Sequence, residues 1–221
     1  MSYVTERREE ERERRRLEIL ATAERLYAER GWEAVTMDQI ARTARLSRAL
    51  LYVYFRDKDD VLLAISAQAL AGLAKRFAAA AASHVRGIDK VSAIGRAYVA
   101  WAIELPHLFD SCARFQARSS ANDDQIVALG DGDQNLKACE FAGDSVLGEV
   151  SAAVAHGLAD GSIAPEVGDP GLFAVTLWGL THGVIQIALN KAENLTRFGT
   201  TPEALHDNAF NALRLAMSPK P

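Results

Sequence analysis

Three helix-start signals lie close together in the first third of this 221-residue sequence. Thr36, followed three residues later by Gln39, matches the capping box that begins a helix. Ser47 and Asp57 are also favourable N-cap residues, because their short side chains can accept hydrogen bonds from the first free backbone amides. Only short helices fit between such closely spaced starts. We therefore predict two short helices and then a long one, at about 37–44, 48–54 and 58–84.

Helical patterns dominate the rest of the chain. Ile19, Ala23 and Leu26 repeat at helical spacing in a helix that Gly31 would end. Alternating strand patterns joined by hairpin dipeptides are missing from the sequence, so the predicted fold class is all-α. Further helices are predicted at about 89–104, 106–117, 135–158, 170–192 and 201–216. The segments between them include two turn-rich connectors, at 119–134 and 159–171.

Charge is distributed unevenly along the sequence. The formal net charge of −4 argues against nucleic acid coating the whole chain. Residues 42–58 nevertheless carry five basic side chains and one acidic side chain. The charged run 6–16 is predicted to be a solvated helix with pairs such as Glu10/Arg14 and Glu11/Arg15. A basic arm that contacts DNA phosphates is the alternative for this run.

The predicted helix 48–54 has two different sides. Leu51 and Phe55 face the core, whereas Ala49 and Val53 point outward. Such an outward surface fits a DNA major groove, where arginine can bind guanine and small apolar groups can meet thymine methyls. Tyrosine hydroxyls and a lysine near a helix start can bind phosphates. The predicted DNA-binding residues are Thr36, Gln39, Ser47, Arg48, Ala49, Leu50, Tyr52, Tyr54 and Lys58.

The stretch containing these residues resembles the DNA-binding module of the TetR family of bacterial transcriptional regulators. It reads GWEAVTMDQIARTARLSRALLYVYFRDKDDVL. Two departures stand out, because Arg45 replaces the usual turn glycine and Ala49–Leu50 replace a small residue followed by threonine. Leu50 lacks a hydroxyl that could contact a base. The positions that fit the family pattern are Gly31, Thr36, Ile40, Ala41, Leu46, Ser47, Leu51, Tyr52, Tyr54, Phe55, Arg56 and Lys58.

The resemblance implies a two-domain regulator. Residues 1–58 would form a three-helix, helix-turn-helix DNA-binding domain with a charged N-terminal extension, and residues 59–221 a helical domain for effector binding and dimerisation. The implied function is a dimeric repressor that binds double-stranded DNA at a near-palindromic operator and is released by a small-molecule effector. The alternatives are an activator, or a ligand-binding or interaction protein whose helix-turn-helix is non-functional.

An enzyme is not expected. The sequence has no nucleophile–base pair, glycine-rich phosphate loop or metal-ligand spacing, so neither a cofactor nor a metal site is predicted. Asp131 and Asp133 flank a glycine, but the spacing and the closing glutamate of a calcium loop are wrong.

Two further sets of candidate residues lie in the C-terminal part. Residues around the break at Pro106 could line a mostly apolar effector pocket, or they could be ordinary core and solvent-facing acids. Helix 170–192 contains a W-x-x-x-H-G arrangement that resembles one subgroup of such domains, and with helix 135–158 it would form a four-helix dimer interface. The effector candidates are Trp101, Glu104, Phe109, Asp110, Cys112 and Phe115. The dimer candidates are Trp178, His182, Gly183 and Gln186.

The compartment is predicted from the cysteines and the N-terminus. Two cysteines without a framework of spacings suit a reducing cytoplasm, and the charged N-terminus has no apolar secretory signal. Residues 171–190 are long enough to span a bilayer. Their polar side chains instead favour a helix buried in protein, including at a subunit interface, so no membrane partner is expected.

Overall fold

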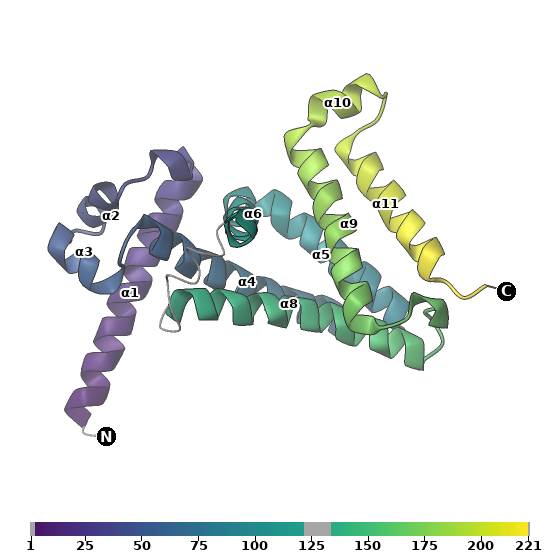
Figure 1. Cartoon of the computed structure of the whole chain (residues 1–221), viewed down its shortest axis with the longest axis horizontal. Helices are drawn as coiled ribbons and strands as arrows, with labels where there is room; N and C mark the ends of the chain where they lie inside the picture. The colour runs from purple at the N-terminus through teal and green to yellow at the C-terminus, as the bar shows by residue number, and fades with distance from the viewer. Residues whose placement is uncertain (1–2, 122–133, 221) are drawn as a thin grey trace. The chain divides into compact units, whose positions relative to one another are not determined.

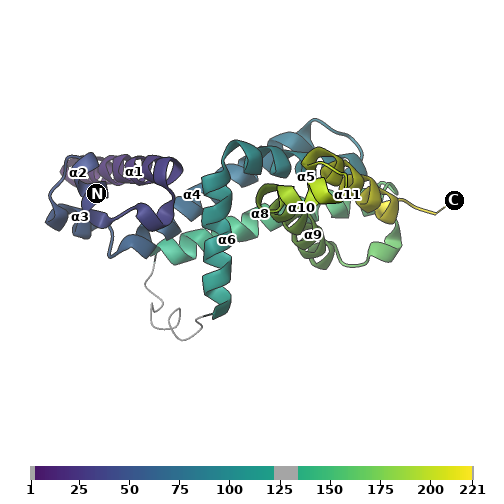
Figure 2. The same cartoon turned by 90° about the horizontal axis from the view of Figure 1, so that it is seen from above.

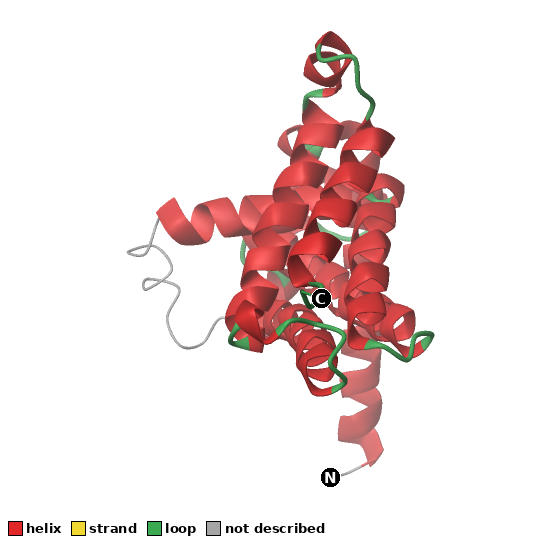
Figure 3. Cartoon of the chain, turned by 90° about the vertical axis from the view of Figure 1, so that its right-hand side faces the viewer, coloured by secondary structure: helices red, strands yellow, loops and turns green. Residues whose placement is uncertain are grey.

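The computed structural model describes residues 3–121 and 134–220, and all regular structure in these two ranges is helical (Figure 3). This confirms the all-α prediction. The helices are α1 (Tyr3–Arg30), η1 (Trp32–Ala34), α2 (Met37–Thr43), α3 (Arg48–Tyr54), α4 (Lys58–Ala82), α5 (Gly87–Glu104), α6 (Pro106–Ala121), α8 (Gln134–Ala159), η2 (Pro165–Val167), α9 (Pro170–Asn190), α10 (Ala192–Arg197) and α11 (Pro202–Met217).

The chain packs into two compact units. The first contains Met1–Ala69 and His107–Glu140, and the second contains Leu70–Pro106 and Phe141–Pro221. Helices α4 and α8 contribute residues to both units. The functional boundary predicted after residue 58 lies within the first unit and stays a prediction.

In the first unit, α1, α2 and α3 form a helix-turn-helix (Figure 1). Ile19 and Leu26 of α1 are buried, as are Ile40 of α2 and Leu51 of α3. The apolar side of each short helix therefore closes a shared core. Phe55, which follows α3 in extended backbone, is also buried in this unit.

The predicted caps define the ends of these helices. The backbone amide of Gln39 donates to Thr36 Oγ1 (3.2 Å), and the amide of Thr36 donates to Gln39 Oε1 (2.9 Å). Ser47 accepts from the amide of Leu50 at the start of α3. Asp57 accepts from the amide of Asp60 at the start of α4. Side-chain oxygens thus satisfy amides that have no partner within their own helices.

In the second unit, α9 packs against both α5 and α11, and Figure 2 shows these helices together from above. The start of α5 lies so close to the end of α8 that a Cβ added to Gly87 would be 2.1 Å from the backbone nitrogen of Gly157. Asp160 and Ser162, which follow α8, accept hydrogen bonds from the amides of Gly87 and Ile88. The connector after α8 therefore caps α5.

Several boundaries differ from the predictions. Helix α6 continues to Ala121, beyond its predicted end at 117, and α10 lies almost entirely between the predicted helices 170–192 and 201–216, where no helix was predicted. The remainder of the predicted 119–134 loop, including Asp131 and Asp133, lies outside the described residues.

Two of the described helices, α4 and α9, are long and apolar enough to cross a membrane. That property is weak evidence for a membrane span, because the core helix of a soluble protein also has it.

Candidate nucleic-acid interface

The outward side of α3 carries the side chains that the sequence pattern placed there. Leu51 is fully buried (0% exposed), whereas Val53 is 63% exposed. Ala49, Leu50 and Tyr52 are exposed as well, and Tyr54 is half-buried. Helix α3 thus presents a mixed apolar and polar surface to solvent, as a helix that enters a major groove must do.

Arg48 is held by two neighbours in this structure. Its Nε atom lies 3.3 Å from Oδ1 of Asp38 on α2, and its Nη2 atom donates to the hydroxyl of Tyr52 at 3.4 Å. The guanidinium also lies over the Tyr52 ring, 5.6 Å from its centroid. The hydrogen bond that Arg48 donates to Tyr52, followed by the charge of Asp38, raises the pKa of Arg48. A DNA base would therefore compete with Asp38 for a permanently charged side chain.

Lys58 begins α4, with its ammonium group 5.0 Å from the centroid of the buried Trp32 ring. A cation over an indole face is attracted by the ring's electron density, which restricts where the side chain goes. Behind Lys58, the buried carboxylate of Asp60 accepts from the amide of Arg56 (2.8 Å) and from Nδ2 of Asn135 (2.6 Å). These contacts hold the start of α4 to the turn that follows α3 and to the start of α8.

Three other predicted DNA-binding side chains are engaged in capping. Thr36, Gln39 and Ser47 each contact the backbone at a helix start. Their structural role is therefore established by geometry, and their contact with DNA stays a prediction. Asp38 was not predicted as a neighbour of Arg48, since the helical periodicity of α3 contains no information about α2.

The six effector candidates divide between the two units. Trp101 stacks on Tyr98 in the second unit, with ring centroids 6.1 Å apart, and Glu104 forms an ion pair with Arg76 at 2.7 Å. In the first unit, Phe109 and Cys112 are buried. The side chain of Phe115 is outside the described part of the structure. Their role as effector residues stays a prediction.

Both cysteines are free and buried, and burial raises the pKa of each thiol to about 12. Thiolate, which is the reactive form, is therefore scarce at neutral pH. This environment is typical of cysteines that pack in a core.

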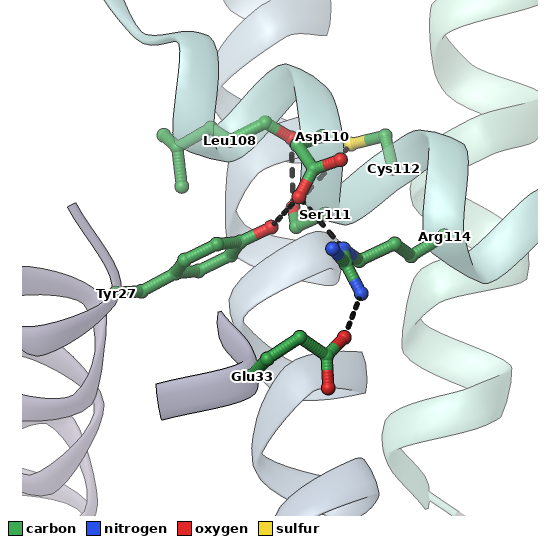
Figure 4. A network of polar contacts seen from close by, with 7 residues as sticks. All are labelled: Tyr27, Glu33, Leu108, Asp110, Ser111, Cys112 and Arg114. Atoms are coloured by element: carbon green, nitrogen blue, oxygen red, sulfur yellow. Dashed lines mark hydrogen bonds and ion pairs between the residues drawn. The ribbon is translucent and has the colours of Figure 1, made fainter. Parts of the chain in front are cut away.

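Asp110 belongs to a polar network that joins α6 to α1 and η1 (Figure 4). The hydroxyl of Tyr27 donates to Oδ2 of Asp110 at 2.5 Å, and Nε of Arg114 donates to the same oxygen at 2.7 Å. Arg114 also pairs with Glu33 of η1. Burial, followed by the carboxylate of Asp110, raises the pKa of Tyr27 above its ordinary value. The network links α6 to the elements that support the helix-turn-helix.

The second unit contains an apolar pocket of about 190 Å³ between α5, α9 and α11. Val99, Val184 and Phe210 are among the side chains that line it, and none of the six effector candidates does.

The candidate dimer residues of α9 contact one another and α5. The ring centroids of Trp178 and His182 are 5.9 Å apart, and Nδ1 of His182 lies 2.8 Å from the hydroxyl of Tyr98. Nε2 of Gln186 lies 3.5 Å from Nε2 of His182. Trp178, His182 and Gln186 thus lie next to one another along α9, as their i, i+4, i+8 spacing predicts. The side chain of His182 points toward α5 of its own chain.

A known protein family matches the part of the sequence that forms the helix-turn-helix. Residues 19–65 match the family model described as bacterial regulatory proteins, tetR family. This range includes the caps, α2, α3 and the start of α4. The helix-turn-helix of this chain is therefore similar to the domain that this family model describes.

Curated relatives of this domain are HTH-type transcriptional regulators by name. The HTH-type transcriptional regulator HbdR of Aromatoleum sp. (strain CIB) is 48% identical over 50 residues, which cover 23% of this chain and 22% of HbdR. The HTH-type transcriptional regulator BetI of Rhizobium meliloti (strain 1021) is 37% identical over 82 residues, which cover 37% of this chain and 40% of BetI. The chain therefore matches well under half of the length of these relatives.

Solved structures extend the likeness of the fold to most of the chain. A protein of unknown function from Rhodococcus sp. RHA1 has a TM-score of 0.72 at 20% identity, covering 92% of this chain and 95% of its own. A tetR-family regulatory protein from Rhodococcus RHA1 has a TM-score of 0.65 at 16% identity, covering 94% and 98%. Most of the chain thus shares the helical fold of these solved structures.

Proposed function

We propose that this chain is a dimeric transcriptional regulator that represses by binding operator DNA and is released by a small-molecule effector. The single observation that carries the proposal is the exposed face of α3, where Arg48, Ala49, Tyr52 and Val53 stand beside Lys58 within the TetR-family domain. TetR-family regulators are non-enzymatic DNA-binding proteins, and the proposed place of action is the bacterial nucleoid in the cytoplasm.

The chemistry of this face supports DNA as the partner. Arg48 can form a bidentate contact with guanine once it leaves Asp38, and Ala49 and Val53 can meet thymine methyls. Tyr52 and Lys58 can bind phosphates, which would set the register of α3 on the duplex. Leu50 adds apolar surface where a hydroxyl could have bound a base.

Exposed apolar side chains on α8 and α9 support a homodimer. Phe141 of α8 is 75% exposed and Leu172 of α9 is 70% exposed, and Val175 and Ile187 of α9 are exposed too. A Cβ added to Gly183 would meet no atom within 4 Å, so space remains there for a second chain. A second copy covering these side chains would remove apolar area from water. Two recognition helices would then bind the two half-sites of a near-palindromic operator.

The contacts of α6 support control by an effector. Asp110 and Arg114 connect α6 to Tyr27 and Glu33, so a ligand that moves α6 would alter the support of the helix-turn-helix. Such a ligand must bind the two states with different affinity. A similar fold, AibR, has been solved in complex with isovaleryl coenzyme A and operator DNA (TM-score 0.60, 17% identity). That complex supports a small-molecule effector without identifying the one that acts here.

A gel-shift titration with the DNA upstream of the coding sequence tests the proposal. Wild-type protein is compared with Tyr52→Ala/Lys58→Ala at low and at physiological salt. Lys75→Ala is the matched control, because it removes the same charge from an exposed position of α4 away from its start. We expect salt-sensitive binding that the double variant loses and the control keeps.

The rival functions predict other results. If the protein binds the upstream DNA and raises transcription of a reporter gene, the chain is an activator. Absence of binding, both to upstream DNA and to a random-sequence pool, would favour a ligand-binding protein whose helix-turn-helix is non-functional.

A further inference from the structure

We propose that the N-terminal part of α1, residues 3–16, is a second DNA-contacting element in which Arg8 and Arg12 bind backbone phosphates. The inference rests on the proposed function, because the helix-turn-helix must first bring the chain to DNA. It extends that function to a segment before the matched range 19–65.

Charge is segregated around this part of α1. Successive residues of an α-helix are rotated by about 100°, so residues at i, i+4 and i+8 form a row that drifts by only about 80°. Arg8, Arg12 and Arg16 form such a row. Four of the five acidic residues of this segment share a different side of the helix: Glu6, Glu9, Glu10 and Glu13. The fifth, Glu11, lies beside Arg14 and pairs with it.

The contacts of α1 show which way the two sides face. The Arg16 guanidinium lies over the ring of Phe55, the residue that caps α3, 5.5 Å from its centroid. On the side of the helix that carries the acidic residues, Glu24 contacts His107 of α6 at 3.4 Å. The row that contains Arg8 and Arg12 therefore faces the α3 side of the first unit, and the acidic side faces α6.

Arg8 and Arg12 are exposed and available. Arg14 pairs with Glu11, Arg15 with Glu18, and Arg16 with Glu13. Among the described residues, Arg8 and Arg12 form no ion pair. The observed partners differ from the Glu10/Arg14 and Glu11/Arg15 pairs predicted from the sequence, and they leave two cations on the α3 side of the helix.

The geometry suits a phosphate backbone. Arg8 lies about 12 Å along the helix axis from Arg16, since each residue adds about 1.5 Å. Arg56 and Lys58 belong to a basic surface that follows α3. The row of Arg8, Arg12 and Arg16 thus extends this surface further. Guanidinium groups bind phosphate through paired N–H donors, and such contacts do not depend on base sequence.

The test measures the salt dependence of binding to a random-sequence duplex, which reports phosphate contacts without requiring the operator. Arg8→Ala/Arg12→Ala is compared with Arg14→Ala/Arg15→Ala, which removes the same charge from the same helix at paired positions. Alanine preserves the helix, and circular dichroism checks this in both variants. Fluorescence anisotropy gives the slope of log K against log salt between about 50 and 200 mM.

We expect Arg8→Ala/Arg12→Ala to reduce the magnitude of the slope by about 3 to 4 for a dimer, because each lost phosphate contact removes about 0.9. The control should change it by about 1 at most. Equal slopes for the two variants would overturn the inference while leaving the proposed function intact. If the wild type does not bind DNA at all, the proposed function itself fails.

Discussion

The hydroxyl of Tyr27 donates to the carboxylate of Asp110 at 2.5 Å, joining positions 83 residues apart. Tyr27 is 3% exposed, on the same helix that supports α2 and α3. Asp110 stands on α6, where Arg114 binds the same oxygen. One hydrogen bond therefore ties the helix-turn-helix to α6 within the first compact unit.

Tyr27→Phe should lower the free energy of unfolding by about 1.5–3 kcal/mol, because it removes a hydrogen bond to a charged group. Urea denaturation of the two proteins measures the difference. Tyr3→Phe is the matched control, since Tyr3 is exposed and should change little. An unchanged midpoint for Tyr27→Phe would show that water replaces the lost bond at no cost.

Asp38→Asn should strengthen DNA binding. The change removes a negative charge beside the proposed groove-facing surface and loosens the ion pair that holds Arg48 at 3.3 Å. A several-fold gain in affinity is expected, while Glu9→Gln at an exposed position of α1 serves as a control for the loss of charge alone. Equal gains from the two variants would mean that Asp38 acts only through long-range charge.

Arg45 adopts a φ of 57°, in the left-handed region where the family pattern has glycine. For a residue with a Cβ this conformation costs about 1–2 kcal/mol. Arg45→Val should therefore destabilise the fold by about 1 kcal/mol or more, since β-branching increases the clash. Arg45→Asn should be neutral or stabilising. Thermal unfolding of both variants compares their stabilities. An Arg45→Val variant as stable as Arg45→Asn would contradict this prediction.

Acid should weaken the second unit through His182. Burial lowers the pKa of His182 below its ordinary value, so the folded chain holds the neutral imidazole. The unfolded chain takes up a proton as the pH falls through about 6.5, whereas the folded chain resists it. Stability should therefore decline below that pH and be fully present above it. His182→Asn should flatten this decline in unfolding curves recorded between about pH 8 and 5.5. His206, whose pKa burial also lowers, should leave a residual slope in the variant.

Local signals in the sequence predicted the helix-turn-helix closely. The spacing of Thr36 and Gln39 predicted a reciprocal cap, and both of its hydrogen bonds are present. Helix α3 begins and ends at the predicted residues, because Ser47 caps it and Leu51 with Phe55 supplies its buried side. These features depend on residues a few positions apart, which a pattern can capture.

Contacts between distant residues could not be predicted in the same way. Nothing near Asp110 in the sequence points to Tyr27, and nothing near Arg48 points to Asp38. The effector candidates were chosen because they cluster around Pro106, yet the fold assigns Trp101 and Phe109 to different compact units. Dimer candidates were chosen from one row of α9, although the most exposed apolar side chains there, such as Leu172, lie elsewhere. Tertiary packing decides such positions.

The proposed function requires that a dimer of this chain binds duplex DNA through α3. Selection of binding sites from a random-sequence pool by the wild-type protein tests it most directly, because it requires no knowledge of the regulated genes. We predict enrichment of a near-palindrome with two equivalent half-sites, whose bases opposite α3 change preference in Arg48→Ala. A pool that remains random after repeated selection at low salt would contradict the account.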